Sequence, residues 1–265
     1  MTSFLQHSPK SKIIEHGYIN IYSKLNPQEM RQISYKRAYK SKNPNWDETQ
    51  VFLAKKFADL TPHNSKIFDA GCGNGNYIID ENRASISWAA GLDVSKDFVQ
   101  KNICLDEIII GNLEKLPFED NSFDAVTSLW VLEHLKNPEA VFAEIYRILR
   151  PSGIFMFATP NRNFLPLIII RILKFTRINH LLNSILFGRK KIYIFETYYR
   201  ANILSDIRRL NKNLFEIVEL KLNYDPSYLS FNSISFRISS LAHKIFNNLG
   251  ISIFEPHIIG ILRKP

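Results

Sequence analysis

The chain has 265 residues, of which 45% are hydrophobic and 22% charged, so it can bury a full core and is not expected to be disordered. Its two cysteines, Cys72 and Cys104, are too few for a disulfide framework and fit a reducing, cytoplasmic setting. Roughly the first thirty residues hold no apolar core of signal-peptide length, and no run of about eighteen apolar residues could span a membrane.

The net charge of +9 is concentrated in one segment. Between Arg162 and Lys212 there are eleven Lys or Arg and two acidic residues, which leaves 23 basic and 23 acidic residues in the rest of the chain. The charge excess is therefore a property of residues 162–212 and not of the chain as a whole.

The N-terminal part is predicted to be helical. Residues 1–46 place tyrosines among basic side chains and are interrupted at Asn43-Pro44-Asn45, which favours short cap helices and loops. Asp47 stands where an N-cap would begin a helix that runs to about Leu60. A strand from Lys66 to Ala70 follows.

Three glycines at alternate positions come after this strand, in the run Asp69-Ala70-Gly71-Cys72-Gly73-Asn74-Gly75, and a helix is predicted from about Asn76. Alternating glycines allow a sharp turn and a close approach of a ligand to the main chain. The dinucleotide fingerprint needs a further glycine where this chain has Asn76. The charge of Asp69 opposes a pyrophosphate and favours a ligand that carries positive charge and no phosphate, such as S-adenosylmethionine.

A second strand is predicted to end at Asp93, which falls 18 residues after Gly75. An acid at about this offset can accept hydrogen bonds from both hydroxyls of a ribose. The alternative is that Asp93 caps the next helix, a task that Ser95 could also perform. Ile108-Ile109-Ile110 is predicted to be a fully buried third strand.

Phe123 to Leu129 is predicted to be the fourth strand, and a helix opens at Asn137-Pro138-Glu139. A fifth strand is expected over Ile154 to Ala158. The order of these elements predicts an α/β fold with a doubly wound parallel sheet.

From Ile67 to about Asn161 the chain resembles the class I S-adenosylmethionine-dependent methyltransferases of the small-molecule branch, on the D-x-G-x-G-x-G loop. The resemblance implies a mostly parallel, seven-stranded Rossmann-like sheet with a helical cap, and S-adenosyl-L-methionine as cofactor. The residues assigned to the cofactor are Asp69, Gly71, Gly73, Gly75, Asp93, Val94, Asn112, Leu113, Leu129 and Arg37.

The resemblance also implies individual roles. Asn112 stands where an aspartate usually contacts the adenine amino group, and its side-chain carbonyl can still accept that hydrogen bond. Leu113 would pack on the adenine, and the main chain near Leu129 would face the methionine part. Arg37 is the candidate for the cofactor carboxylate, with a solvated basic helix face as the alternative.

His134 is the candidate catalytic residue, as the only histidine that the sequence places beside the site. An imidazole there could take a proton from a substrate oxygen. It could instead only anchor its loop by a hydrogen bond. No metal-ligand spacing is present among the histidines and cysteines.

The rest of the chain divides into residues 162–250, a substrate cap followed by a helix from Tyr198 and a strand over Phe215 to Leu222, and residues 251–265, which hold a final antiparallel strand. Residues 47–161 form the cofactor-binding core, and residues 1–265 are predicted to be one domain.

The predicted function is methyl transfer to a small-molecule or lipid-like acceptor. A cofactor-binding protein without transfer activity and an NAD-dependent oxidoreductase are the alternatives. Nucleic acid is disfavoured as acceptor because residues 129–132 read Leu-Trp-Val-Leu, unlike the element of base-methylating enzymes. Residues 162–212 interleave cations with large apolar residues, which favours peripheral contact with an anionic membrane; an ordinary lid over the active site is the alternative.

Overall fold

The computed structural model describes residues 13–15, 18–20, 27–173 and 195–265. The strands are β1 (Ile13–Glu15), β2 (Tyr18–Asn20), β3 (Ser65–Ala70), β4 (Ile86–Asp93), β5 (Glu107–Ile110), β6 (Phe123–Leu129), β7 (Leu149–Pro160), β8 (Glu216–Asn223) and β9 (His257–Arg263). The helices are α1 (Pro27–Lys42), α2 (Thr49–Leu60), α3 (Tyr77–Asn82), α4 (Lys96–Val99), α5 (Pro138–Ile148), α6 (Leu165–Leu173), α8 (Leu204–Asn211) and α9 (Ser233–Asn248). Short 3₁₀ turns occupy Arg83–Ser85 and Leu132–His134.

Seven strands form one sheet in the order β5-β4-β3-β6-β7-β9-β8. The first five are parallel to their neighbours, and β9 runs antiparallel to both β7 and β8. The chain order reverses between β3 and β6, which makes the carboxyl ends of these two strands the topological switch point. The predicted doubly wound sheet and the antiparallel last strand are confirmed.

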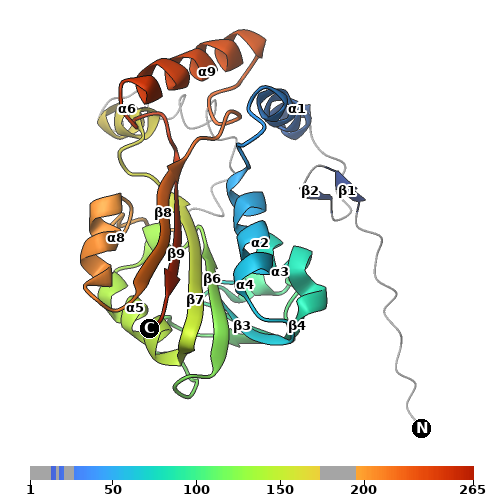
Figure 1. The fold of residues 1–265 in the computed structure, drawn as a ribbon, viewed down its shortest axis with the longest axis vertical. Coiled ribbons are helices and arrows are strands. Elements are labelled where there is room, and N and C mark those ends of the chain that lie inside the picture. Colours follow the sequence, from blue (N-terminus) through green and yellow to red (C-terminus); the bar gives the residue numbers. More distant parts are fainter. Residues whose placement is uncertain (1–12, 16–17, 21–26, 174–194) are drawn as a thin grey trace.

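Helices cover both faces of the sheet (Figure 1). One face packs on α5 and α8, and the other packs on α2 and α3. Helix α5 illustrates why: Asn137 caps it, Pro138 occupies its first turn, and apolar residues recur on one side through Val141, Ile145 and Ile148. The central strands are therefore buried on both sides and read as continuous apolar runs.

Three predicted elements differ from the structure. Asp47 is not a helix cap, because its carboxylate pairs with Lys40 and Lys55 and α2 begins two residues later. Strand β5 is not fully buried, because it lies at the edge of the sheet and Ile110 is half exposed. No helix begins at Tyr198; the next helix starts at Leu204.

The described part of the N-terminal 46 residues also departs from the prediction of short helices. It contains one 16-residue helix, α1, and a two-stranded hairpin of β1 and β2. Helix α1 lies at the same end of the molecule as α6 and α9, beyond the carboxyl ends of the parallel strands (Figure 1). These three helices form the cap that the sequence predicted in outline.

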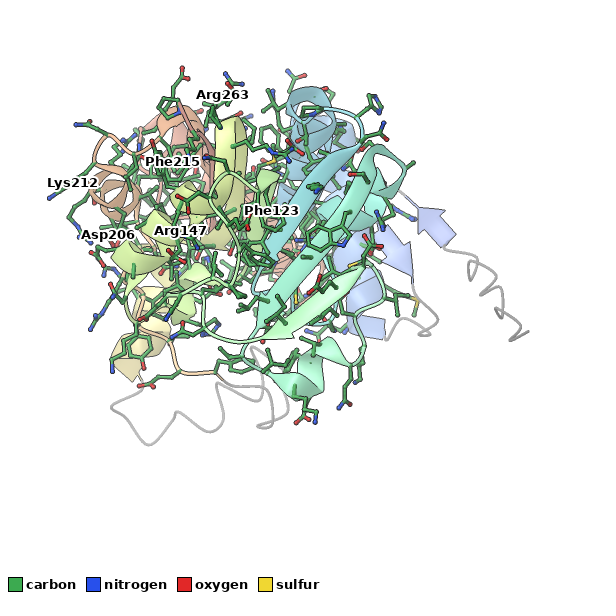
Figure 2. All side chains as sticks on the ribbon, turned by 90° about the horizontal axis from the view of Figure 1, so that it is seen from below. Phe123, Arg147, Asp206, Lys212, Phe215 and Arg263 are labelled. Atoms are coloured by element: carbon green, nitrogen blue, oxygen red, sulfur yellow. The ribbon has the colours of Figure 1, made fainter. Side chains whose placement is uncertain are left out.

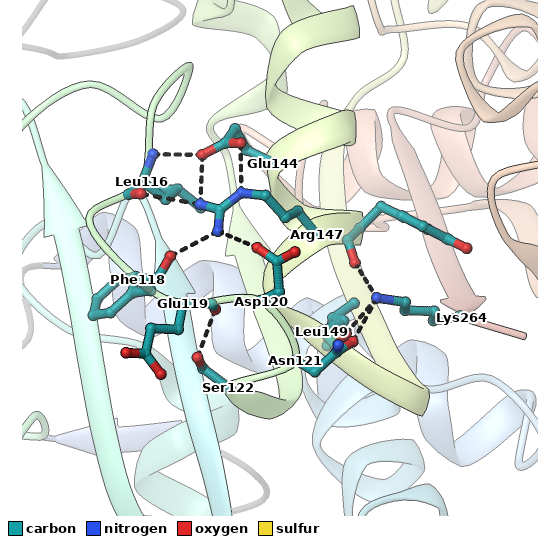
Figure 3. Close-up of polar contacts among 11 residues, drawn as sticks. Leu116, Phe118, Glu119, Asp120, Asn121, Ser122, Glu144, Arg147, Leu149 and Lys264 are labelled. Carbon is teal, nitrogen blue, oxygen red and sulfur yellow. Dashed lines mark hydrogen bonds and ion pairs between the residues drawn. The ribbon is translucent and has the colours of Figure 1, made fainter.

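Figure 2 views the molecule from the opposite end of the sheet, with Arg147 labelled, and polar contacts close this end. The Arg147 guanidinium binds the carboxylates of Glu144 and Asp120 and two backbone carbonyls (Figure 3). The ammonium of Lys264 donates to Asn121 Oδ1 and to two further carbonyls at 2.7–2.9 Å. The loops at this end are thus fixed by internal hydrogen bonds. The end of the sheet that can admit a ligand is therefore the other one, beneath the cap.

Candidate active site

The glycine loop turns sharply where β3 ends. Gly71, Gly73 and Gly75 have φ values of 80°, 42° and 140°, a region that side chains rarely adopt. A Cβ on Gly71 would also overlap the side chain of Val131. After the loop, Asn76 caps α3 by accepting from the backbone N–H of Ile78 at 2.9 Å. The main chain of the loop is therefore accessible at the switch point, and the capped start of α3 fixes the point where the loop ends.

Asp69 is buried beneath this loop, with 1% of its surface exposed. Its Oδ1 accepts from Asn76 Nδ2 at 2.8 Å and from Thr127 Oγ1 at 2.9 Å, so it ties the loop to β6. Its Oδ2 is buried and has no hydrogen-bond partner among the described residues. Burial raises the pKa of this carboxyl to about 7.

Asp93 ends β4, the strand beside β3, and reaches back to the glycine loop. Its Oδ2 accepts from the backbone N–H of Gly73 at 2.9 Å, and its Oδ1 accepts from that of Ser95 at 2.8 Å. Ser95 is the N-cap of α4 by position, but its side chain makes no capping bond. The structure brings Asp93 and the glycine loop together; the ribose contact stays a prediction.

The predicted adenine-binding residues follow β5, next to Asp93. Asp93 is paired in register with Ile110, and the N–H of Gly111 donates to the Asp93 carbonyl at 3.0 Å. Leu113 is buried, whereas Val94 is 66% exposed. The Oδ1 of Asn112 accepts from the N–H of Glu114 at 3.0 Å, so one of its two acceptor positions is already used.

Arg37 belongs to helix α1 of the N-terminal part. It is exposed on α1, while its neighbour Lys36 pairs with Glu48 and lies 3.6 Å from Asp225. Its proposed contact with the cofactor carboxylate stays a prediction.

The end of β6 carries a strained aromatic residue. Leu129 is the last strand residue, and Trp130 follows with φ of 61°, which is unusual for a bulky side chain. The Trp130 N–H donates to the Ala158 carbonyl at 2.9 Å, and its ring meets the ring of His257 edge-on at 4.7 Å. Strain of this kind is typical of functional sites.

His257 is a second histidine at the site, and the expectation that His134 would be the only one is wrong. It opens β9, and because β9 is antiparallel its first residue lies at the carboxyl ends of the parallel strands. The ring is buried, with Nδ1 3.0 Å from Thr49 Oγ1. Burial lowers the pKa of His257 to about 4, so the imidazole is neutral near pH 7. The signal that could have located His257 is the predicted antiparallel strand over residues 258–262, because the residue before such a strand lies at the carboxyl ends of the parallel strands.

His134 lies on the turn after β6, partly exposed. Its Nδ1 is 2.7 Å from the backbone carbonyl of Glu196, so Nδ1 carries the proton and donates. In the neutral ring Nε2 is then the basic nitrogen, 3.8 Å from Glu133 Oε1. The histidine therefore anchors a neighbouring segment and keeps a basic nitrogen, so both predicted roles are compatible with its geometry.

The neighbouring segment is 195–203, which is hydrogen-bonded to the turn after β6. The N–H groups of Tyr198 and Tyr199 both donate to the Glu133 carbonyl, at 2.8 and 3.1 Å. The buried Thr159 hydroxyl donates to Glu133 Oε2 at 3.1 Å and accepts from Asn202 Nδ2 at 2.6 Å. This segment and the turn at Glu133 thus form one hydrogen-bonded unit.

Neither cysteine is a candidate nucleophile. Cys72 and Cys104 are both buried, and burial raises the pKa of each thiol. Within the described ranges no three His, Cys, Asp or Glu side chains are grouped to hold a metal ion. The arrangement is suited to binding a flat, cationic ligand over the glycine loop and to accepting a proton at a histidine.

The described helices include none that is both long and apolar enough to cross a membrane. The cations Lys174 and Arg177, predicted to meet a membrane, lie outside the described residues, and the side chain of Arg171 is not described either.

Comparison with known proteins agrees with this geometry. A family model described as a methyltransferase domain matches residues 68–157. A protein named probable S-adenosylmethionine-dependent methyltransferase, from Mycolicibacterium smegmatis, is 37% identical over 102 residues, which are 36% of this chain and 38% of the relative. The demethylmenaquinone methyltransferase of Oceanobacillus iheyensis is 31% identical over 156 residues, 55% of this chain and 61% of the relative.

Solved structures extend the likeness to the whole fold. A chain from the complex of the Haloferax volcanii Trm112 methyltransferase activator with its methyltransferase superposes with a TM-score of 0.54 at 18% identity, covering 88% of this chain and 96% of that one. The matched residues span 38% and 61% of the length of the two curated relatives above. Residues 68–157 are thus similar to a methyltransferase domain, and the sheet is similar to that of the solved structure.

Proposed function

We propose that the chain transfers a methyl group from S-adenosyl-L-methionine to a small-molecule or lipid-like acceptor. The observation that carries the proposal is the pairing of two motifs at the switch point: the glycine loop after β3, and the Asp93 carboxylate that accepts from the N–H of Gly73. The match of residues 68–157 to a methyltransferase domain supports it over the oxidoreductase alternative.

Three groups would hold the cofactor. Gly71, Gly73 and Gly75 leave the main chain open to close approach, and Asp93 retains acceptor capacity for a ribose diol. Val94 and Leu113 supply apolar walls beside Asn112 for the adenine. The orphaned Asp69 Oδ2 is a buried acceptor beneath the loop, and the ionised form of this carboxyl would favour a cation over a phosphate. The cofactor supplies a methyl group on a sulfonium, which is a good leaving group.

The protein's own contribution to transfer would be orientation and proton removal. Holding two reactants in line supplies much of the acceleration that such a displacement needs. The acceptor would enter between the end of β6, with Leu129 and Trp130, and the segment at His134. Nε2 of His134 is the base that this arrangement offers for a proton from the acceptor.

The acceptor class rests on the relatives and the cap. One relative's name places demethylmenaquinone as its substrate, which supports a small, apolar acceptor. The described start of residues 162–212, helix α6, is apolar and leaves Ile169 46% exposed. This supports peripheral contact of that segment with a membrane, while the Leu-Trp-Val-Leu sequence of residues 129–132 disfavours nucleic acid as acceptor.

A binding titration and a transfer assay test the proposal. Asp93→Ala should weaken binding of S-adenosylmethionine by roughly 1.5–3 kcal/mol, the loss of hydrogen bonds to a charged acceptor. Isotope-labelled cofactor, incubated with a cell extract and the protein, should label a small molecule or lipid. His134→Gln should lower that transfer about a hundredfold and leave cofactor affinity nearly unchanged.

Two results would contradict these assignments. Tight cofactor binding with no label in any extract would identify a cofactor-binding protein without transfer activity. If His134→Gln weakened cofactor affinity and stability together without a separate loss of turnover, His134 would be only the anchor of residues 195–203.

A further inference from the structure

Helix α9 presents a continuous apolar face to the outside of the protein. Ile234, Ile238, Leu241, Ile245 and the following Leu249 recur every three or four residues and are each 49–68% exposed. Residues at this spacing lie on one side of a helix. Phe231 before the helix and Ile251 after it are more than 40% exposed as well. An apolar stripe of this length on a surface marks a binding surface.

The stripe does not face the core, because the other side of α9 already does. Phe236 stacks on Tyr35 at 4.7 Å, and His243 stacks on Tyr224 at 3.8 Å. Near the end of the helix, the Phe246 ring lies 5.1 Å from that of Phe254. The inner face thus packs on α1, on the residue that follows β8 and on the segment before β9. The exposed stripe is a second face of the helix.

The charges on α9 indicate what would cover the stripe. The helix contains no Asp or Glu, and its two formal cations, Arg237 and Lys244, are both exposed. On a helix with 100° between successive residues, both fall along the same border of the stripe. Neither forms an ion pair with any residue in the described ranges. An apolar stripe bordered by cations is the pattern of a helix that lies in the interface of an anionic membrane.

A second copy of the chain fits this face less well. Two copies meeting stripe to stripe would bring four cations together without an acid on either helix, in a chain with a net charge of +9. A membrane that contains anionic lipid supplies the opposite charge, and each Lys or Arg near such a surface contributes about 1 kcal/mol. The charge complementarity therefore favours a membrane.

We propose that the outer face of α9 docks the protein on an anionic membrane surface. Figure 1 shows α9 at the outermost end of the molecule, beyond the carboxyl ends of the parallel strands, where the candidate active site lies. Docking through α9 would thus turn the capped end of the sheet toward the lipid. The proposal stands apart from the proposed methyl transfer, because docking is measured without cofactor or acceptor.

Sedimentation with vesicles tests the proposal. The full chain should sediment with vesicles of phosphatidylcholine and phosphatidylserine at low salt, and much less with phosphatidylcholine alone. Ile238→Ser with Leu241→Ser should reduce binding by roughly tenfold or more, because the apolar area that enters the headgroup boundary is lost. Arg237→Gln with Lys244→Gln should reduce it by a similar factor and flatten its salt dependence.

Matched variants keep the result specific. Lys66→Gln with Lys115→Gln, two exposed cations outside α9 and outside residues 162–212, lowers the net charge equally, and Ile103→Ser with Ile217→Ser removes exposed apolar residues elsewhere. Both should bind like the unchanged protein, and all variants should keep its circular dichroism and melting temperature. No binding to anionic vesicles, equal loss in the control variants, or a concentration-dependent dimer abolished by the Ile238 and Leu241 changes would each overturn the proposal.

Discussion

At the scale of single residues, a substitution in the glycine loop can change ligand binding much more than it changes the stability of the fold. A Cβ on Gly73 would meet no protein atom closer than 4.0 Å, whereas one on Gly71 would overlap Val131. Gly73→Ala should therefore cost only the strain of its positive φ, roughly 1–2 kcal/mol, and should abolish the rise in melting temperature that S-adenosylmethionine causes.

The control for that variant is Gly250→Ala. Gly250 has a similar positive φ of 71° and open space around it, and it lies after α9. It should lower the melting temperature by a comparable amount and preserve the cofactor-induced shift. If Gly73→Ala preserved the shift as well, the loop would not be in contact with the cofactor.

The buried carboxyl of Asp69 predicts a pH dependence of stability. Its pKa is raised from 3.8 to about 7, so folding favours the protonated form. The contribution of Asp69 is fully present below about pH 4 and is lost as pH rises through about 7, a change of at most roughly 4 kcal/mol. Asp69→Asn cannot ionise, so its stability should not fall in this way.

The measurement is urea unfolding of both proteins between pH 5 and pH 8. The difference in unfolding free energy between Asp69→Asn and the unchanged protein should shift in favour of the variant as pH rises. The difference isolates Asp69 from His257, whose pKa moves in the other direction. A difference independent of pH would show that Asp69 is ionised throughout.

Several of these residues could be predicted from the sequence alone because their spacing along one strand and loop determines their position. Gly71, Gly73 and Asp93 are of this kind, since parallel neighbouring strands bring their carboxyl ends together. His257 could not be predicted in the same way. It arrives from the other end of the chain through β9, and its contact with Trp130 depends on how that strand registers against β7.

At the scale of elements, helices and strands with strong local sequence signals were predicted well. Features that depend on the assembled fold were predicted poorly. Strand β6 and helix α5 match their predicted positions because a short run of buried residues and a capped apolar helix face are local signals. Strand β5 was wrongly predicted as fully buried, since only the assembled sheet shows that it lies at an edge. No helix forms at Tyr198 because the N–H groups there bind the Glu133 carbonyl instead.

The attachment of residues 195–203 gives a prediction for an element. Thr159→Val removes the hydroxyl that donates to Glu133 and accepts from Asn202. Losing these buried hydrogen bonds should cost about 1–3 kcal/mol and loosen the segment. Limited proteolysis should then cut within residues 195–203 faster than in the unchanged protein.

Ser128→Ala is the matched variant for Thr159→Val. It removes another buried hydroxyl, whose hydrogen bond goes to the Ala70 carbonyl at 2.9 Å and not to residues 195–203. It should lower stability without faster cleavage in that segment. Equal cleavage in both variants would mean that the segment is held by other contacts.

At the scale of the whole molecule, the two ends of the sheet have different tasks. The end with the carboxyl termini of the parallel strands carries the glycine loop, Asp93, His134 and the cap, while the other end is closed by Arg147 and Lys264 (Figures 1 and 3). This division follows from the topology, because the strand order reverses only at the first end. Substitutions at the closed end should therefore affect folding and not ligand binding.

Lys264→Met tests this division. The ammonium of Lys264 is the donor to Asn121 Oδ1 and to the carbonyls of Tyr146 and Leu149, and burial lowers its pKa. Replacing it with an apolar chain of similar length should lower the free energy of unfolding by roughly 1–3 kcal/mol, because these acceptors lose their partner. The dissociation constant for S-adenosylmethionine, measured well below the melting temperature, should stay within about twofold of the unchanged value, a change of about 0.4 kcal/mol or less in binding free energy. A larger loss of affinity would show that strain at the closed end reaches the glycine loop through the sheet, and the two ends would then have to be treated as one coupled unit.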